Sequence, residues 1–226
     1  MERYELKRYI TYQQYLMMRQ RARAVMQTDP YSTPDGDYLI TNVYFDDMYD
    51  TGYFEKTDGV ARRSKFRMRA YNNDPSYIVM ECKAKQADRI EKTQYRLTAE
   101  QADAILAGDT DVLAGIGDPL CRDITARMKG RGLRPVVGVR YRREAYIYPV
   151  CNVRITFDME LHASTDLRVV DQDNGCPVFM DNRGIMEIKY DDFIPEHLTR
   201  LFRNEAPKMA MSKYVLCRQR LNGKIE

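Results

Sequence analysis

The chain has 226 residues, of which 44% are hydrophobic and 31% are charged, and its net charge is +3 at pH 7. This apolar content suits a folded core and excludes disorder caused by a shortage of apolar side chains. So small a net charge gives no general basic coat for nucleic acid. No segment approaches the roughly 20 apolar residues of a membrane helix, and the first residues lack an apolar signal segment. We therefore expect one cytoplasmic domain, residues 1–226, that binds no nucleic acid.

The cysteines and histidines do not predict a zinc site or a disulfide framework. Five cysteines are present, an odd number, and no Cys-x-x-Cys pair occurs. His162 and His197 are far apart in the sequence and have no metal-ligand spacing. We expect reduced, mostly buried thiols.

The first half of the chain predicts strands separated by turns, with a helix near the start. Thr11 caps this helix, which runs to about Met26. Alternating or β-rich sequence predicts strands at 3–10, 38–45, 63–71, 77–85 and 92–97.

The second half predicts both helices and strands. Thr98 and Gln101 form a capping box that opens a helix ending near Gly108. Further helices are expected at about 118–129, 195–202 and 212–221. Further strands are expected at 135–148, 152–161, 178–180 and 184–190. The chain therefore has about eight strands in neighbouring hairpins, which predicts antiparallel pairing, and it lacks a glycine-rich phosphate loop.

Lysine and arginine occupy alternating positions on several predicted strands. In the segment Lys65-Phe66-Arg67-Met68-Arg69, the three cations share one face and the two apolar residues share the other. The other strands place further cations in the same way: Lys7, Lys83, Lys85, Lys92, Arg96, Arg154 and Lys189. The carboxylates on these polar faces are Glu5, Glu81, Asp158 and Glu187.

These charged faces have two interpretations. For any one strand, a solvated face of a half-buried sheet is the simpler explanation. Taken together, however, the faces are biased towards cations although the chain is nearly neutral, and the predicted helices are available to cover the apolar faces. This combination favours an α+β fold, a closed antiparallel β-tunnel of about eight strands with helices packed outside. Only a dense anion such as a triphosphate or polyphosphate would offset the repulsion inside.

The sequence resembles the VTC-domain polyphosphate polymerases, a branch of the triphosphate tunnel metalloenzymes. The resemblance runs from Arg3 to Arg218 and is specific because its motifs occur in order. These motifs are Arg3-Tyr4-Glu5-Leu6-Lys7, Val43-Tyr44-Phe45-Asp46, Lys65-Phe66-Arg67-Met68-Arg69, Glu81-Cys82-Lys83, Lys92 with Arg96, Tyr141-Arg142-Arg143, Val153-Arg154-Ile155-Thr156-Phe157-Asp158, Glu187-Ile188-Lys189 and Ser212-Lys213-Tyr214.

The resemblance implies transfer of the γ-phosphate of ATP to a growing polyphosphate chain, with Mn²⁺ or Mg²⁺. It also allows a membrane partner, although this chain has no membrane segment. The implied catalytic residues are Lys7, Arg67, Arg69, Lys83 and Lys213. The implied polyphosphate contacts are Lys65, Lys92, Arg96, Arg143, Arg154 and Lys189. Glu187 is the implied metal ligand, with Glu5 as a second candidate.

One residue departs from the pattern of the hydrolytic relatives. Those proteins begin with Glu-x-Glu-x-Lys, whereas Arg3 occupies the first acidic position here and Glu5 and Lys7 keep the other two. The loss of this carboxylate favours synthesis over cleavage. Two alternatives stay open: an inorganic or nucleoside triphosphatase, and a non-catalytic polyphosphate-binding module.

Overall fold

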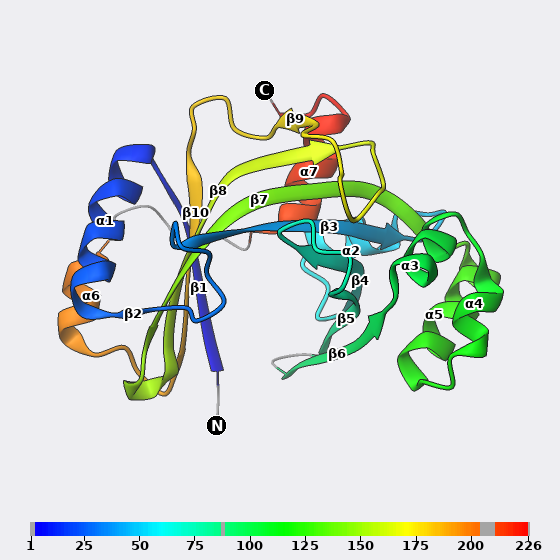
Figure 1. Cartoon of the computed structure of the whole chain (residues 1–226), viewed down its shortest axis with the longest axis horizontal. Helices are drawn as coiled ribbons and strands as arrows, with labels where there is room; N and C mark the ends of the chain where they lie inside the picture. Colours follow the sequence, from blue (N-terminus) through cyan, green and yellow to red (C-terminus); the bar gives the residue numbers. More distant parts are fainter. Residues whose placement is uncertain (1–2, 87–88, 204–210, 226) are drawn as a thin grey trace.

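A computed structural model describes residues 3–86, 89–203 and 211–225 (Figure 1). Its long strands are β1 (Arg3–Ile10), β3 (Asp37–Asp46), β4 (Arg62–Tyr71), β5 (Ile78–Gln86), β6 (Arg89–Leu97), β7 (Arg134–Tyr148), β8 (Val153–Ser164) and β10 (Gly184–Asp191). Two short strands, β2 (Gln27–Thr28) and β9 (Cys176–Pro177), pair at the margins with β7 and β8. The predicted long strands are confirmed to within a few residues.

The helices are α1 (Tyr12–Val25), α2 (Thr51–Thr57), α3 (Ala99–Leu106), α4 (Thr110–Gly115), α5 (Pro119–Arg131), α6 (Glu196–Leu201) and α7 (Lys213–Leu221), with a 3₁₀ turn at Val150–Asn152. The N-cap predicted at Thr11 and the capping box predicted at Thr98 are both present, and Thr11 also forms a capping box, with Gln14. The helices α2 and α4 were not predicted from the sequence. Among the described residues, every helix is too short or too polar to cross a membrane.

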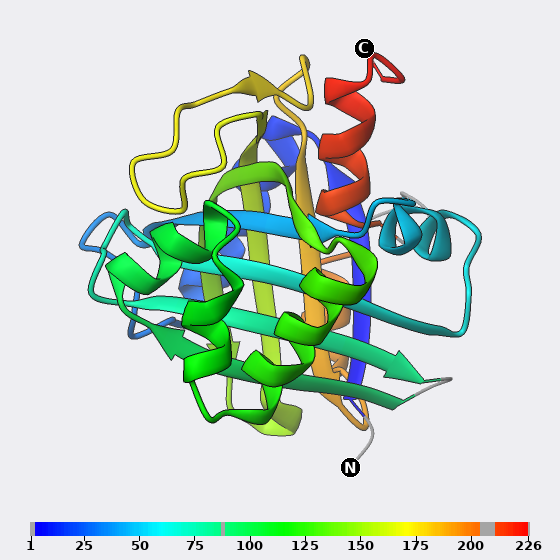
Figure 2. The same cartoon turned by 90° about the vertical axis from the view of Figure 1, so that its right-hand side faces the viewer.

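The eight long strands form one antiparallel sheet in the order β1-β10-β8-β7-β3-β4-β5-β6. The sheet bends so strongly that β1 and β6, its two ends in this order, lie opposite each other (Figure 1). Figure 2 shows β4, β5 and β6 crossing in front of β1, β8 and β10. In the described residues no ladder joins β1 to β6, and a side-chain pair spans this gap instead: Lys83 Nζ of β5 lies 3.5 Å from a carboxylate oxygen of Glu5 in β1.

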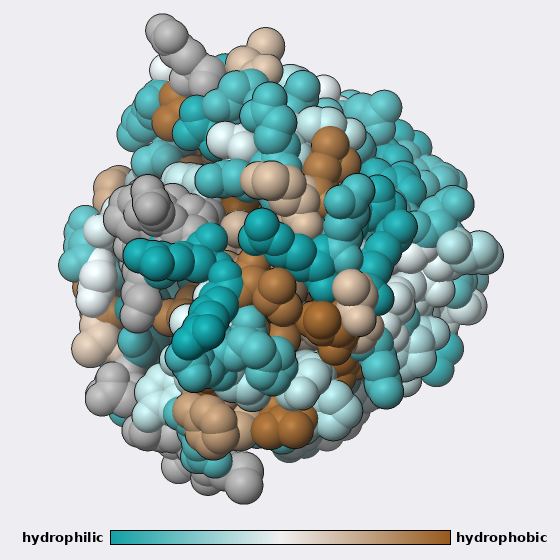
Figure 3. Space-filling view, turned by 90° about the vertical axis from the view of Figure 1, so that its left-hand side faces the viewer, coloured by the Kyte–Doolittle hydropathy of each residue, from teal (hydrophilic) through white to brown (hydrophobic). Residues whose placement is uncertain are grey.

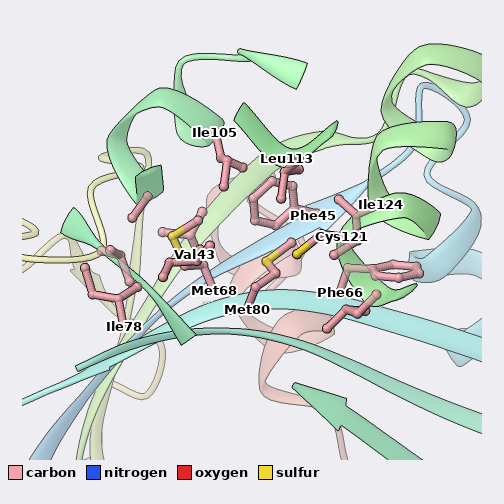
Figure 4. Close-up of a cluster of buried hydrophobic side chains, with 14 of the residues drawn as sticks. Val43, Phe45, Phe66, Met68, Ile78, Met80, Ile105, Leu113, Cys121 and Ile124 are labelled. Carbon is pink, nitrogen blue, oxygen red and sulfur yellow. The ribbon is translucent and has the colours of Figure 1, made fainter. Parts of the chain in front are cut away.

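The helices α3, α4 and α5 cover the outer face of β3 to β6. The apolar residues that alternate with the cations point to this side, so Phe66 and Met68 of β4 pack with Ile105 of α3, Leu113 of α4 and Ile124 of α5 (Figure 4). Burial of these side chains stabilises the folded protein through the hydrophobic effect. It also determines that the opposite, charged face of each strand points to the interior.

A second apolar layer joins α1 and α6 to β8 and β10. Its members include Met18 of α1, Phe157 of β8, Met186 of β10 and Leu198 of α6. Figure 3 shows this side of the molecule, where hydrophobic residues form small groups between hydrophilic ones. With helices on the outside of both halves of the sheet, the predicted α+β tunnel fold is confirmed.

The helix α7 packs against the inner face of the sheet. Its residues Tyr214, Val215 and Cys217 are buried with Val139 of β7 and Leu161 of β8. The first residue of α7 is Lys213, so this packing brings a predicted catalytic lysine to the interior.

The strand predicted at 178–180 is wrong. The chain pairs only at β9, just before this segment, and then turns. Pro177 has no N–H to donate, and Val178 makes a single backbone hydrogen bond, to the Leu161 carbonyl at 2.8 Å. Asn182 then has a positive φ of 55°, which ends any extended run.

Candidate active site

The pairing of β4, β5 and β6 aligns their charged residues in rows across the interior. Lys65 lies opposite Lys83, which lies opposite Lys92. In the next row, Arg67 lies opposite Glu81. Because alternate residues point to opposite faces, both rows face away from the outer apolar layer.

The other half of the sheet contributes matching rows. Lys7 of β1 lies opposite Glu187 of β10, which lies opposite Thr156 of β8. Glu5 lies opposite Lys189, which lies opposite Arg154, in the neighbouring row. The outward neighbours in these strands, including Ile155 and Met186, belong to the layer under α1 and α6.

We use the term lumen set for the charged residues that β1, β4–β8, β10 and the start of α7 turn to the interior away from the strand ends. Arg63, Lys85, Arg96 and Asp191 share these strand faces but lie beside the strand ends, and they are not counted in the set. Among the described residues, the set contains ten cations and four carboxylates. The cations are Lys7, Lys65, Arg67, Arg69, Lys83, Lys92, Arg143, Arg154, Lys189 and Lys213, and the carboxylates are Glu5, Glu81, Asp158 and Glu187.

Glu81 joins two strands through two cations. Arg67 Nε and Lys92 Nζ each lie 2.6 Å from a different oxygen of its carboxylate. Burial alone would raise the pKa of Glu81, but Arg67, Arg69 and Lys92 outweigh it and hold that pKa at about 2. Glu81 is therefore ionised at neutral pH.

Asp158 is shared in the same way by Arg143 and Lys213. Two Arg143 nitrogens lie 2.5 and 2.7 Å from the two Asp158 oxygens, and Lys213 also forms an ion pair with the carboxylate. Burial opposes ionisation of Asp158, but these two cations lower its pKa to about 2. The Lys213 ammonium also lies 4.7 Å from the centre of the Tyr141 ring.

Glu187 and Glu5 are held by lysines. Glu187 lies 3.6 Å from Lys7 Nζ and 2.5 Å from Lys189 Nζ, while Glu5 pairs with Lys7 and Lys83. Burial would raise the pKa of Glu187, but Lys7 and Lys189 hold it well below its usual value. Each lumen carboxylate therefore has two cationic partners.

Two cations of the lumen set have no carboxylate partner among the described residues. Lys65 donates a hydrogen bond to Ser212 Oγ at 2.6 Å, and burial together with nearby cations lowers its pKa to about 7. Arg69 donates from Nε to the Asn42 side-chain oxygen at 2.8 Å and also contacts the Tyr141 hydroxyl at 3.4 Å. Both cations are available to an anionic ligand without an ion pair being broken.

Arg154 and Arg96 have other surroundings. Arg154 donates to Asp29 at 2.6 Å and to the Tyr38 hydroxyl at 3.1 Å. Arg96 donates to the Ser76 carbonyl at 2.7 Å and lies over the Tyr77 ring. Arg96 is exposed at the edge of the tunnel, apart from the network that links the four carboxylates.

Several interior residues were not among the predicted site residues. The alternating pattern placed Glu81 and Asp158 on the polar faces, but they were not assigned a role in the site. Asn42 and Ser212 contact Arg69 and Lys65. Thr156 is 5% exposed, and its hydroxyl has no hydrogen-bond partner among the described residues. No sequence signal distinguishes this threonine from a surface residue of a strand.

The carboxylates suit a metal ion that is coordinated partly by the protein and partly by substrate phosphates. No group of three or more His, Cys, Asp and Glu side chains in the described part of the chain could hold a metal alone. Glu187, however, is buried, faces the interior and lies within electrostatic range of Glu5 and Asp158. Mg²⁺ is commonly bound by one or two carboxylates together with substrate phosphates, which this arrangement permits.

Comparison with protein families identifies the fold. The model of the VTC domain matches residues 2–222. The chain belongs to the VTC domain family. This result confirms the resemblance seen in the ordered motifs and, with it, membership of the triphosphate tunnel superfamily. No curated protein matches the sequence significantly.

Two solved structures share the fold of this VTC domain at low sequence identity. HpAC1 from Hippeastrum, named as a candidate adenylyl cyclase and found to have a dominant triphosphatase activity, is 15% identical, with a TM-score of 0.58 and coverage of 100% of this chain and 98% of that one. The PH1819 protein from Pyrococcus horikoshii OT3 is 16% identical, with a TM-score of 0.51 and coverage of 96% and 99%.

Proposed function

We propose that this VTC domain is a polyphosphate polymerase, which transfers the γ-phosphate of ATP to the end of a polyphosphate chain in the tunnel. The observation that carries the proposal is the cationic excess of the lumen set, ten cations against four carboxylates. Like charges brought together in a protein interior repel strongly unless an anion balances them. An extended polyphosphate carries the charge density that this lumen needs.

The predicted site residues divide into two kinds of phosphate contact. Arg67, Arg69 and Arg143 present planar guanidinium groups that can donate two parallel hydrogen bonds to non-bridging oxygens. The lysines act as point charges along the phosphate chain. In the absence of phosphate, the carboxylates occupy the same cations, so ligand binding exchanges one set of anionic partners for another.

The reaction needs no proton transfer. An oxygen of the terminal phosphate of the acceptor attacks the γ-phosphorus, the bond from that phosphorus to the β–γ bridging oxygen breaks, and ADP leaves with the electron pair on its terminal phosphate. The lumen cations stabilise the charge on both oxygens. Glu81 and Asp158, whose pKa values are about 2, are poor bases for activating water, which supports transfer to phosphate.

Glu187 would hold the Mn²⁺ or Mg²⁺ ion, with Glu5 as a further candidate ligand. Such an ion would supply charge neutralisation to the phosphate oxygens. Lys7 and Lys189 contact Glu187 in the free protein and orient its carboxylate towards the interior.

A triphosphatase is the second candidate. Lys65, whose pKa is about 7, is partly neutral near pH 7, and a neutral amine can accept a proton from water. The dominant triphosphatase activity of HpAC1 gives this alternative a precedent on the same fold.

The free thiols support a reducing compartment. Cys82, Cys121 and Cys217 are buried, Cys151 and Cys176 are partly buried, and all five are unpaired. Unpaired thiols are typical of cytoplasmic proteins. We therefore propose that residues 1–226 act as one catalytic unit in the cytoplasm, where ATP is available.

One assay separates the candidates. The purified protein is incubated with ATP and Mn²⁺, polyphosphate is resolved on a gel, and orthophosphate is measured in parallel. Polyphosphate is the expected product; orthophosphate alone would show a triphosphatase, and tight binding without turnover would show a binding module. Glu187→Gln should abolish turnover, whereas Glu196→Gln on the exposed face of α6 should leave it unchanged. Retained turnover in Glu187→Gln would contradict the metal assignment.

A further inference from the structure

A pocket of about 800 Å³ lies outside the lumen, among β4, β5, α2 and α5. None of the site residues predicted from the sequence lines it. Its volume falls within the range of roughly 300–1,000 Å³ that is typical of small-molecule sites. The pocket can therefore accept a group that is separate from the phosphate chain.

The floor of the pocket is apolar. Phe45, Phe66 and Leu133 line it and are 4%, 5% and 6% exposed. Figure 4 shows Phe66 beside Ile124 and Cys121 of α5, with Phe45 between Cys121 and Leu113. The Arg127 guanidinium lies 5.0 Å from the centre of the Phe66 ring. Such a floor favours a flat apolar group such as a nucleobase.

The rim of the pocket is cationic. Arg62, Arg63, Lys85 and Arg131 line it, and none of them forms an ion pair with a carboxylate in the described residues. The lining also contains four carboxylates, but Asp123 pairs with Arg127, and Asp46 and Asp47 accept from backbone N–H groups of α2, which leaves Glu55. Arg63 donates instead to the Val60 carbonyl at 2.5 Å. A rim of this kind attracts an anionic group to the edge of an apolar floor.

The rim continues into the lumen along one ladder. Arg63 and Lys85 are partners between β4 and β5, and the pair two residues further along is Lys65 and Lys83 of the lumen set. Two residues of a strand span about 7 Å. The charge of Arg63 also contributes to the low pKa of Lys65, so the two groups interact electrostatically. Arg63 and Lys85 lie next to the ends of β4 and β5, so a ligand that passes these strand ends can contact the pocket and the lumen together.

Hydrogen-bond acceptors lie on the α2 side of the pocket. Glu55 and Thr51 of α2 line it. Burial, together with Asp46 and Asp47, raises the pKa of Glu55. A ribose hydroxyl or an exocyclic amine would satisfy these acceptors, whereas a phosphate would be repelled by them. The pocket thus has an apolar floor, an anion-binding rim next to the lumen and acceptors on a further side.

We propose that this pocket binds the nucleoside of ATP. The base lies on the floor formed by Phe45 and Phe66, and the α-phosphate lies between Arg63 and Lys85, while the β- and γ-phosphates extend into the lumen. The proposal rests on the proposed function, because it requires the terminal phosphates to bind the lumen set. It accounts for nucleotide recognition by a tunnel whose own lining is specific only for phosphate.

Ala126 allows the pocket to be filled without changing the lumen. This residue lines the pocket from the exposed side of α5, so Ala126→Trp adds bulk there and leaves the core intact. Ala24→Trp on the exposed side of α1 is the matched control. Titration calorimetry in the presence of Mg²⁺ measures the Kd of ATP and of inorganic triphosphate for each protein. Thermal unfolding shows whether each variant is folded. Ala126→Leu is a smaller substitution that replaces the tryptophan variant if the latter is unstable.

We expect Ala126→Trp to weaken the affinity for ATP by about tenfold or more. Its affinity for inorganic triphosphate should stay within about twofold of the wild-type value. The control should change neither affinity. An unchanged ATP affinity, or an equal loss for both ligands, would overturn the nucleoside site. A separate variant tests the lumen assignment itself. If that assignment is wrong, inorganic triphosphate will bind Arg67→Met as tightly as it binds the wild type.

Discussion

Arg67 and Glu81 form an ion pair across the inner face of β4 and β5, with Arg67 Nε 2.6 Å from a Glu81 oxygen. The Glu81 side chain is 3% exposed, and its other oxygen accepts from Lys92. This carboxylate holds together two cations that would otherwise repel, and it occupies groups that a phosphate would bind. It should therefore stabilise the free protein and compete with the ligand.

Glu81→Gln tests this dual role. The substitution leaves Arg67 buried without a charged partner, which we expect to lower the free energy of unfolding by about 3 kcal/mol without ligand. Inorganic triphosphate should recover most of this loss and should bind more tightly than it binds the wild type, because one competing negative charge is gone. Urea unfolding with and without triphosphate measures both effects.

The control for this variant is Glu196→Gln, which breaks the exposed pair with Arg200 on α6. An exposed pair contributes only about 0–1 kcal/mol, so a small change that triphosphate does not alter is expected. Weaker triphosphate binding by Glu81→Gln would contradict the competition between carboxylate and ligand.

Acid should destabilise the protein through Glu81 and Asp158. Their folded-state pKa values are about 2, below the ordinary values of 4.5 and 3.8, so the unfolded chain binds more protons between these limits. Stability should be fully present above about pH 5 and should fall as the pH drops towards 2, by on the order of 2–3.5 kcal/mol for each group. Urea unfolding at several pH values from 7 to 3 measures this decrease in the free energy of unfolding. The decrease should be smaller in Asp158→Asn than in the wild type. An equally steep loss in that variant would exclude Asp158 as a cause.

The strand register was largely predictable because alternation encodes it. In Lys65-Phe66-Arg67-Met68-Arg69, the apolar residues could only face the helices, so the three cations had to face the interior. The N-cap at Thr11 and the capping box at Thr98 likewise fixed two helix starts. Local sequence determines such features, and they were therefore visible before the fold was known.

The pairing of charges was not predictable. Asp158 meets Lys213, which is 55 residues away along the chain, only because α7 packs inside the curved sheet. The helix α2 was also missed, although Asp46 accepts from the Gly52 and Tyr53 N–H groups and Asp47 from Thr51. These aspartates act from several residues before the helix, outside the usual N-cap spacing.

Lys65 should take up a proton when triphosphate binds. Burial lowers its pKa to about 7 in the free protein, and a neighbouring phosphate would raise it. Between these two pKa values, binding consumes a proton, so affinity should fall as the pH rises from 7 to 9, by at most about tenfold per unit for one proton. The cations that also lower this pKa are Lys56 of α2, Lys7 of β1, Arg63 of β4 and Lys83 of β5.

Calorimetry at pH 8 in two buffers with different ionisation enthalpies measures this uptake. ATP is the ligand for this measurement, because its terminal phosphate has a last pKa of about 6 and is almost fully ionised at that pH. We expect an uptake of up to about one proton by the wild type. Lys65→Gln should show much less uptake at that pH. Equal uptake by the two proteins would assign the proton to another group.

Thr156 should contact the ligand directly. Its hydroxyl is buried without a hydrogen-bond partner in the part of the chain that the structure describes, and it lies in the row of Lys7 and Glu187. A buried hydroxyl without a hydrogen bond is costly, and a phosphate oxygen beside Glu187 would satisfy it. Thr156→Val preserves the shape of the side chain and should weaken triphosphate binding by about tenfold, since a hydrogen bond to a charged group contributes roughly 1.5–3 kcal/mol.

Thr41 of β3 provides the matched control for Thr156. Its hydroxyl is also buried and has no hydrogen-bond partner within residues 3–86, 89–203 and 211–225. Thr41 alternates with Asn42, however, and so lies on the opposite face of the strand. Thr41→Val should leave triphosphate affinity unchanged and should slightly stabilise the protein, because it removes an unsatisfied polar group. Titration calorimetry gives the affinities, and urea unfolding gives the stabilities. If both variants bind triphosphate as the wild type does, the Thr156 hydroxyl does not contact phosphate, and its burial reflects packing alone.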